Sequence, residues 1–210
     1  MTRRIVENVP AEILQADLKK YRQLALDLGA SAAEIIKTDR VIVDERVRAK
    51  CSNPKCAAYG TNANCPPHAP DLETVRKIVG KYTYALLIYS SFPGQNFTDG
   101  ATTPKAVESR QQNHDIVNRV EAAAFDDGYY LATGLADGPC RALYCIDKDC
   151  TVLQGKRCRV PFKARYAMES WGMDAYRMAV QAGWEIYPIG KNAQKSQVPV
   201  AVALGLVLIY

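Results

Sequence analysis

The 210-residue sequence lacks an apolar segment long enough to cross a membrane. Its first residues, MTRRIVENVPAEIL, are charged and contain no apolar core of a secretory signal. Its last residues, VPVAVALGLVLIY, are apolar but number only 13, whereas a membrane-spanning helix needs about 20. We therefore expect no membrane association, a buried strand or hairpin at the carboxyl end, and a cytoplasmic location.

The sequence also lacks the short motifs of several enzyme classes. It contains no G-x-G-x-x-G, no P-loop and no G-x-S-x-G, which disfavours nucleotide-binding proteins and serine hydrolases. A cysteine protease needs a histidine oriented by a third group, and the chain has only two histidines. Although the formal net charge is +5, no expected helix carries a basic stripe interleaved with stacking aromatics, so we expect no nucleic-acid partner.

The cysteines are unevenly distributed along the chain. All seven fall into two blocks. The first block is CSNPKCAAYGTNANCPP (51–67), and the second lies within GPCRALYCIDKDCTVLQGKRCRVP (138–161). Stable disulfides are uncommon in a reducing cytoplasm, and free cysteines that only fill a core would be scattered. The flanking polar residues and prolines suit loops, so the two blocks indicate metal ligation.

Apolar periodicity predicts helices that alternate with strands. Helices are expected over 11–29, 71–82, 103–128 and 174–182. Strands are expected over 35–36, 41–43, 84–91, 129–135, 184–189 and at the carboxyl end, with a turn at 38–40 and a long loop over 92–104. This order predicts an α/β or α+β sandwich, with one main sheet flanked by helices and a cysteine-rich metal-binding loop region. Residues 1–210 are expected to form a single domain, in which 138–173 forms a small lobe around its metal.

The second block has four potential ligands, spaced Cys140-x4-Cys145-x4-Cys150-x7-Cys158. Four thiolates suit one tetrahedral zinc ion or one iron–sulfur cluster. The block contains no histidine and no C-x-x-C pair of the kind that is common in structural zinc sites. Its wide spacing favours the larger [4Fe–4S] cluster, and zinc is the alternative.

Basic residues surround the second block. Residues 138–177 contain eight Lys or Arg and four Asp or Glu, which accounts for +4 of the net charge of +5. Such a field would compensate a negatively charged thiolate site, and it would attract an acidic redox partner. We predict that Arg159 and Arg165 neutralise this site and donate hydrogen bonds to sulfur or to nearby carbonyl groups.

The first block has three cysteines, Cys51, Cys56 and Cys65, and Gly60 is expected to form a turn that folds Cys65 back toward the other two. Three thiolates leave one ligand position of a metal site to be explained. His68 is a candidate for that position, which could instead hold a ligand from a partner protein, a substrate or a water. A further alternative is that all seven thiolates surround one shared site.

The two blocks together resemble the domain of unknown function 2284, a family of predicted metal-binding proteins common in anaerobic bacteria and archaea. The resemblance covers most of the chain and implies a bound metal, in particular iron–sulfur, but no established reaction. The resemblance is based on these positions: Cys51, Cys56, Tyr59, Gly60, Cys65, Pro66, Pro67, Gly138, Cys140, Cys145, Cys150, Cys158, Arg159, Pro161, Arg165, Met168, Glu169, Gly172 and Asp174.

Three functions follow as expectations. The first is an iron–sulfur protein with one or two [4Fe–4S] clusters that transfers electrons or assists a redox enzyme. The second is a zinc protein that binds a partner. The third is an enzyme in which a cluster with an open iron position binds substrate. The sequence indicates neither the electron donor nor the oligomeric state.

Overall fold

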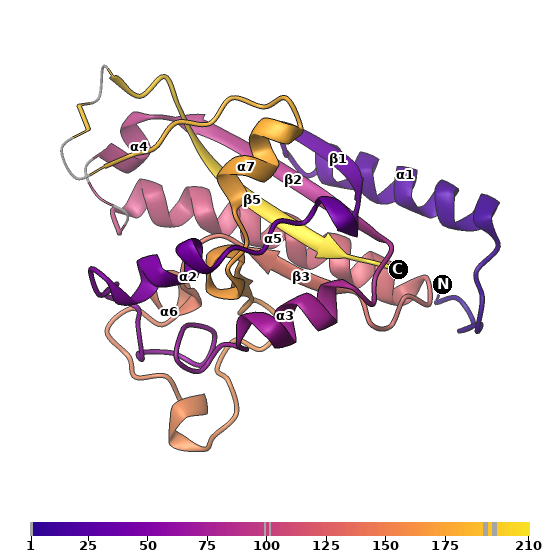
Figure 1. Cartoon of the computed structure of the whole chain (residues 1–210), viewed down its shortest axis with the longest axis horizontal. Coiled ribbons are helices and arrows are strands. Elements are labelled where there is room, and N and C mark those ends of the chain that lie inside the picture. Colours follow the sequence, from indigo (N-terminus) through magenta and orange to yellow (C-terminus); the bar gives the residue numbers. More distant parts are fainter. Residues whose placement is uncertain (1, 99, 101, 191–192, 195–196) are drawn as a thin grey trace.

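A five-stranded mixed sheet forms the centre of the computed structural model, which describes all residues except 1, 99, 101, 191–192 and 195–196. Its strand order is β1–β2–β5–β3–β4, and only β3 and β4 are parallel neighbours (Figure 1). The strands are β1 (Ala32–Lys37), β2 (Tyr84–Pro93), β3 (Thr133–Ala136), β4 (Tyr166–Ala167) and β5 (Val200–Leu208). Helices flank this sheet, which confirms the predicted fold class.

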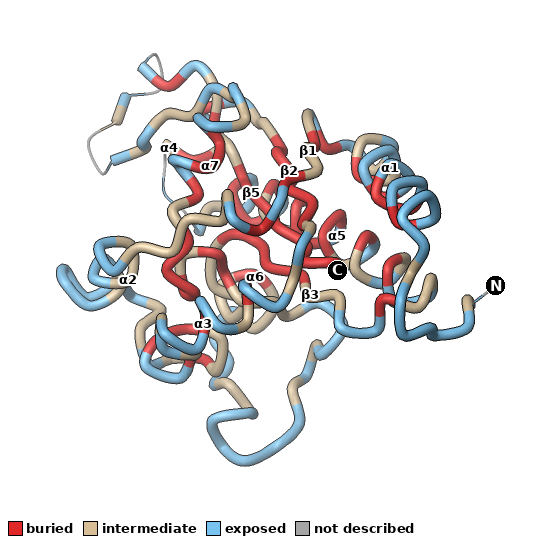
Figure 2. Tube along the Cα trace, turned by 45° about the vertical axis from the view of Figure 1, so that its right-hand side comes forward, coloured by how far each residue is buried: buried red, intermediate tan, exposed pale blue. Residues whose placement is uncertain are grey.

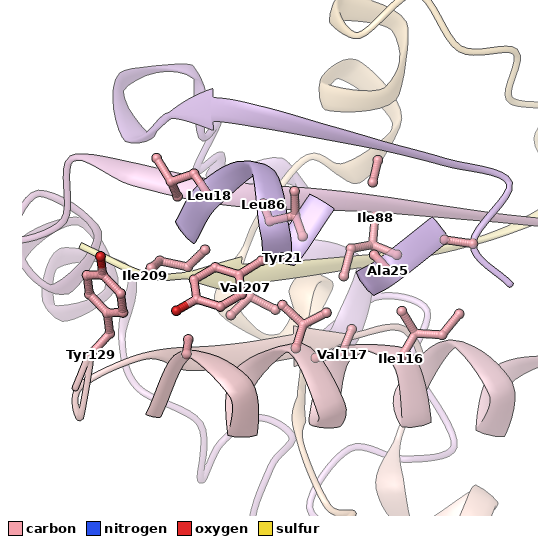
Figure 3. Close-up of a cluster of buried hydrophobic side chains, with 14 of the residues drawn as sticks. Leu18, Tyr21, Ala25, Leu86, Ile88, Ile116, Val117, Tyr129, Val207 and Ile209 are labelled. Carbon is pink, nitrogen blue, oxygen red and sulfur yellow. The ribbon is translucent and has the colours of Figure 1, made fainter. Parts of the chain in front are cut away.

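Two long helices cover one face of the sheet, α1 (Ala11–Asp27) and α5 (Pro104–Asp126). Leu18 and Tyr21 of α1 belong to the same buried cluster as Leu86 of β2 and Val117 of α5 (Figure 3). Thr103 caps α5, because its hydroxyl accepts the Ala106 N–H at 3.3 Å. Both predicted helices are confirmed.

Two glycines let α5 lie close to the sheet. A Cβ atom on Gly205 of β5 would lie 2.4 Å from Val117 Cγ2, and one on Gly134 of β3 would lie 2.7 Å from Val117 Cγ1. Gly205 therefore marks a close approach of α5 and not the turn of a hairpin, and the apolar carboxyl end forms the single strand β5.

The opposite face of the sheet is covered by α3 (Leu72–Val79), α7 (Ala175–Gln181) and the short 3-10 helix η3 (Met168–Trp171). The Asp71 carboxylate caps α3 by accepting the Thr74 N–H at 2.9 Å. Burial is concentrated along the sheet and α5, whereas the loop that follows α6 (Cys140–Tyr144) is mostly exposed (Figure 2). No helix in the part of the chain described has both the length and the apolarity to cross a bilayer.

Several local predictions are wrong. Residues 41–43 form only one isolated bridge, Val43 with Met173, and the unpredicted helix α2 (Glu45–Ser52) leads into the first block. Residues 129–132 precede β3 without joining it, and residues 184–189 do not form a strand. The expected loop over 92–104 begins as the end of β2 and contains α4 (Gln95–Thr98); residues 99 and 101 of that prediction lie outside the described residues.

Candidate metal centre

Both cysteine blocks lie at the same end of the molecule (Figure 1). The first block runs from the last turn of α2 to α3, and the second runs from the start of α6 toward β4. All seven cysteines are free thiols. The fold therefore brings together two segments that are about 70 residues or more apart in the sequence.

The first block folds back on itself. The Cys56 N–H donates to the Cys51 carbonyl at 3.0 Å, and the Gly60 N–H donates to the Pro66 carbonyl at 2.7 Å. Gly60 has a φ angle of +74°, as expected for a glycine turn. Cys65 is buried, and all three cysteines of the block border one cavity of about 500 Å³.

Arg48 of α2 holds this block against the body of the protein. Its guanidinium donates to the carbonyl groups of Ala69, Pro70 and Ser170, so it joins α2 both to the segment before α3 and to η3. Cys51 lies about one turn later in the same helix.

The second block surrounds Cys140, the first residue of α6. Burial and the charges of neighbouring thiols raise the pKa of Cys140 to about 12. These neighbours are Cys65, Cys150, Cys158 and Cys145. The Val160 N–H lies 3.4 Å from the Cys158 sulfur and donates to it. These thiols would repel one another as thiolates, and a bound cation would relieve that repulsion.

The turn at residues 62–64 of the first block contacts thiols of the second. Asn64 Nδ2 lies 3.6 Å from Cys140 Sγ, and Cys140 Sγ lies 3.8 Å from Asn62 Oδ1. Burial raises the pKa of Cys150, but three backbone N–H groups, one of them from Ala63, and the charge of Arg159 outweigh burial and lower it. Cys56 and Cys145 also border a common cavity of about 380 Å³. The two blocks are therefore adjacent parts of one region.

Within the described residues, no group of three or more His, Cys, Asp or Glu side chains closes around a single metal ion. A [4Fe–4S] cluster binds each thiolate through a different iron, so its thiolates stand further apart than those around one zinc ion. The soft donor set and the N–H groups directed at sulfur fit such a cluster.

The remaining predicted residues occupy different places. Arg159 is exposed and donates to the Asp149 carbonyl, next to Cys150. Arg165 instead forms an ion pair with Glu121 of α5 at 2.6 Å and donates to the carbonyl groups of Pro161 and Ala164. His68 is exposed and does not line the cavity that the three first-block cysteines border. Their predicted roles remain predictions.

Three of the charged residues that line the cavity of about 500 Å³ bordered by the first-block cysteines had no role assigned to them from the sequence. Arg110 of α5 donates to Asp137 Oδ2 at 2.9 Å, while Asp137 Oδ1 is buried without a hydrogen-bond partner. Glu169 of η3 lies on the same wall, and its pKa is raised to about 7 by burial and by the charge of Asp137. Burial likewise raises the pKa of Asp137 to about 6 despite Arg110. Of these three residues, only Glu169 could have been found from the sequence, because it belongs to the Met168–Glu169 portion of the family motif.

Comparison with known proteins identifies the family of the chain. A family model described as "Predicted metal-binding protein (DUF2284)" matches residues 34–209, a span that contains both cysteine blocks and the charged residues of the cavity. Searches of curated proteins and of solved structures find no match. Because the family model covers most of the sequence, the chain belongs to the DUF2284 family of predicted metal-binding proteins.

Proposed function

We propose that this protein is a cytoplasmic iron–sulfur protein that transfers electrons or assists a redox enzyme. The observation that supports this proposal is the gathering of seven free thiols from two distant segments into one region. Thiolates are soft ligands that select zinc or iron–sulfur clusters, and hydrogen bonds to sulfur tune the potential of a cluster.

The second block would hold one [4Fe–4S] cluster through Cys140, Cys145, Cys150 and Cys158. Bound there, the cluster would supply one-electron chemistry. Arg159 would compensate its negative charge from the Asp149 carbonyl, and the Val160 N–H would donate to the Cys158 sulfur.

The basic residues around the second block favour an acidic redox partner. Arg141, Lys148, Lys156 and Arg157 lie in or beside the exposed loop after α6, whose apolar Ile146 and Phe162 side chains are 57% and 85% exposed. Complementary charge would speed the encounter with an acidic protein, and the apolar side chains would provide contact area.

The cavity favours a second candidate function for the first block. Cys51, Cys56 and Cys65 supply three thiolates, and the described residues that line their cavity include no further cysteine or histidine. A [4Fe–4S] cluster held by these three thiols would keep one iron open to a ligand, as a catalytic zinc site keeps one open position. The protein would then be an enzyme.

Analysis of iron, zinc and sulfide after anaerobic purification tests the proposal. We expect brown protein with about eight irons per chain, because each [4Fe–4S] cluster contributes four. Cys158→Ser should lose the second-block cluster, which is about half of the total iron, and Cys65→Ser should lose the other half with the first-block cluster. Colourless protein with zinc would instead support a structural zinc protein, and about four irons that both variants remove would indicate one shared site.

A further inference from the structure

The cavity next to Cys51, Cys56 and Cys65 contains carboxyl oxygens that lack a partner. Asp137 is only 9% exposed, and its Oδ1 atom is buried without a hydrogen bond. Glu169 forms no ion pair with another residue that the structure describes, and Asp137 lies close enough to affect its pKa. Buried polar atoms are almost always paired, so the unpaired Asp137 oxygen, on the same cavity wall as the Glu169 carboxyl group, points to a missing donor.

Formal charges indicate what kind of donor is missing. The charged residues that line the cavity are Arg110, Lys50, Asp137, Glu169 and Asp174, which leaves a net charge of −1 before the thiols are counted. Arg110 is already bonded to Asp137, and Asp174 caps α7 by accepting the Arg177 N–H. Glu169 forms no ion pair with another described residue, so we assign the excess negative charge of the wall to it.

We propose that this cavity binds a small bifunctional ligand, with an ammonium group that pairs with Glu169 and Asp137 and with a thiol or other soft donor that faces the metal held by Cys51, Cys56 and Cys65. The ammonium group is inferred from the carboxyl pair alone. The inference of a soft donor depends on the proposed function, in which the first block holds a metal. A cavity of about 500 Å³ accommodates a molecule of this kind.

Three probes that share a thiol and differ at the other end test the proposal: 2-aminoethanethiol, 2-mercaptoethanol and 3-mercaptopropionate. Each is titrated anaerobically into the reconstituted protein, and binding is followed by calorimetry and by the spectrum of the cluster. We expect 2-aminoethanethiol to bind at least about tenfold more tightly than 3-mercaptopropionate. A buried charge-assisted hydrogen bond can supply a difference of this size. 2-Mercaptoethanol should fall between them.

Glu169→Gln should abolish the preference for the amine while leaving the iron content unchanged. Glu73→Gln is the matched control, because Glu73 is an exposed carboxylate of α3 outside the cavity, and it should leave the preference intact. Asp137→Asn provides an independent second variant if Glu169→Gln does not fold. Equal binding of the three probes, a preference for the carboxylate, or a preference that survives Glu169→Gln would overturn the proposal.

Failure of the proposed function is measured separately. If iron analysis shows no metal at the first block, the soft end of the ligand has no metal to bind and the first-block cluster is wrong. The same three probes titrated into reduced, iron-free protein then test the carboxyl pair alone. A tenfold amine preference there supports the ammonium end of the site, and its absence overturns it.

Discussion

Asp17 is a buried carboxylate of α1 that accepts hydrogen bonds from Arg3 at 2.5 Å and from the Tyr129 hydroxyl at 2.8 Å. Burial raises the pKa of Asp17, but these hydrogen bonds outweigh burial, so its pKa lies below its usual value. A depressed carboxyl pKa stabilises the fold above the unfolded-state pKa of about 4. This contribution is lost progressively as the pH falls from that value through the lower native-state pKa.

Asp17→Asn should lower the free energy of unfolding at pH 7 by about 1–3 kcal/mol, because two donors lose a charged acceptor. Urea unfolding at pH 7 and near pH 3 measures the effect, and the difference between the wild type and the variant should be smaller at the lower pH. Asp27→Asn, at an exposed position of the same helix, is the control and should change little. An equal difference at both pH values would contradict a charge-dependent role.

Arg159 offers a test of electrostatics at the second block. Arg159→Glu should lower the reduction potential of the cluster bound there and retain most of the iron, since a positive charge near Cys150 becomes negative. Arg157→Glu makes the same charge change two residues away, at an exposed position. Anaerobic voltammetry of both variants provides the comparison. An equal shift in both would mean that only the net charge of the loop matters.

At the scale of elements, the sequence predicted those with a strong apolar period. α1 and α5 each place several buried residues at helical spacing, and β2 is an apolar run buried on both faces. α2 was missed because none of its residues is buried, so no apolar stripe marks it. Its start has a local cap, because the Asp44 carboxylate accepts the Arg46 N–H at 2.8 Å. A tertiary contact adds to it, since the Asp44 N–H donates to the Gly172 carbonyl at 2.9 Å.

Gly172 joins η3 to the start of α2 and to α3, and its replacement should be costly. Its φ angle is +71°, and an added Cβ would lie 2.5 Å from Leu72 Cδ2. We expect Gly172→Ala to lower the free energy of unfolding by about 2–5 kcal/mol, from backbone strain and overpacking together.

Gly155→Ala separates these two causes. Gly155 has nearly the same φ angle, +73°, but an added Cβ would meet nothing within 4 Å. Urea unfolding should therefore show a loss of only about 1–2 kcal/mol for this variant. Equal losses in the two variants would rule out the contact with Leu72 as a cause.

At the scale of the whole molecule, the sequence predicted the thiols better than their surroundings. The cysteines of each block are close in the sequence, so spacing alone marks them as candidate ligands. Asp137, Glu169 and Arg110 come from the end of β3, from η3 and from α5, and no local spacing joins them. The contact of the 62–64 turn with Cys140 is also a product of the tertiary fold.

Metal removal should affect the loop after α6 more than the central sheet. The loop after α6 exposes Ile146, Val152, Leu153 and Phe162, so it has little apolar packing of its own. Ligation would then supply much of its stability. After anaerobic chelation, we expect amide hydrogen exchange to rise about tenfold or more over 145–163 and to change little in β2 and β5. Uniform loss of protection would show that the sheet also depends on the metal.

The position of β5 imposes an order on synthesis. This strand lies between β2 and β3, yet it is made after both of them and after all seven cysteines. The centre of the sheet therefore cannot close until residue 208 has left the ribosome. Until then the nascent chain presents its thiols without the scaffold that positions them. Cellular metal delivery to this protein is accordingly expected to follow the synthesis of β5, and premature capture of a soft metal would compete with folding.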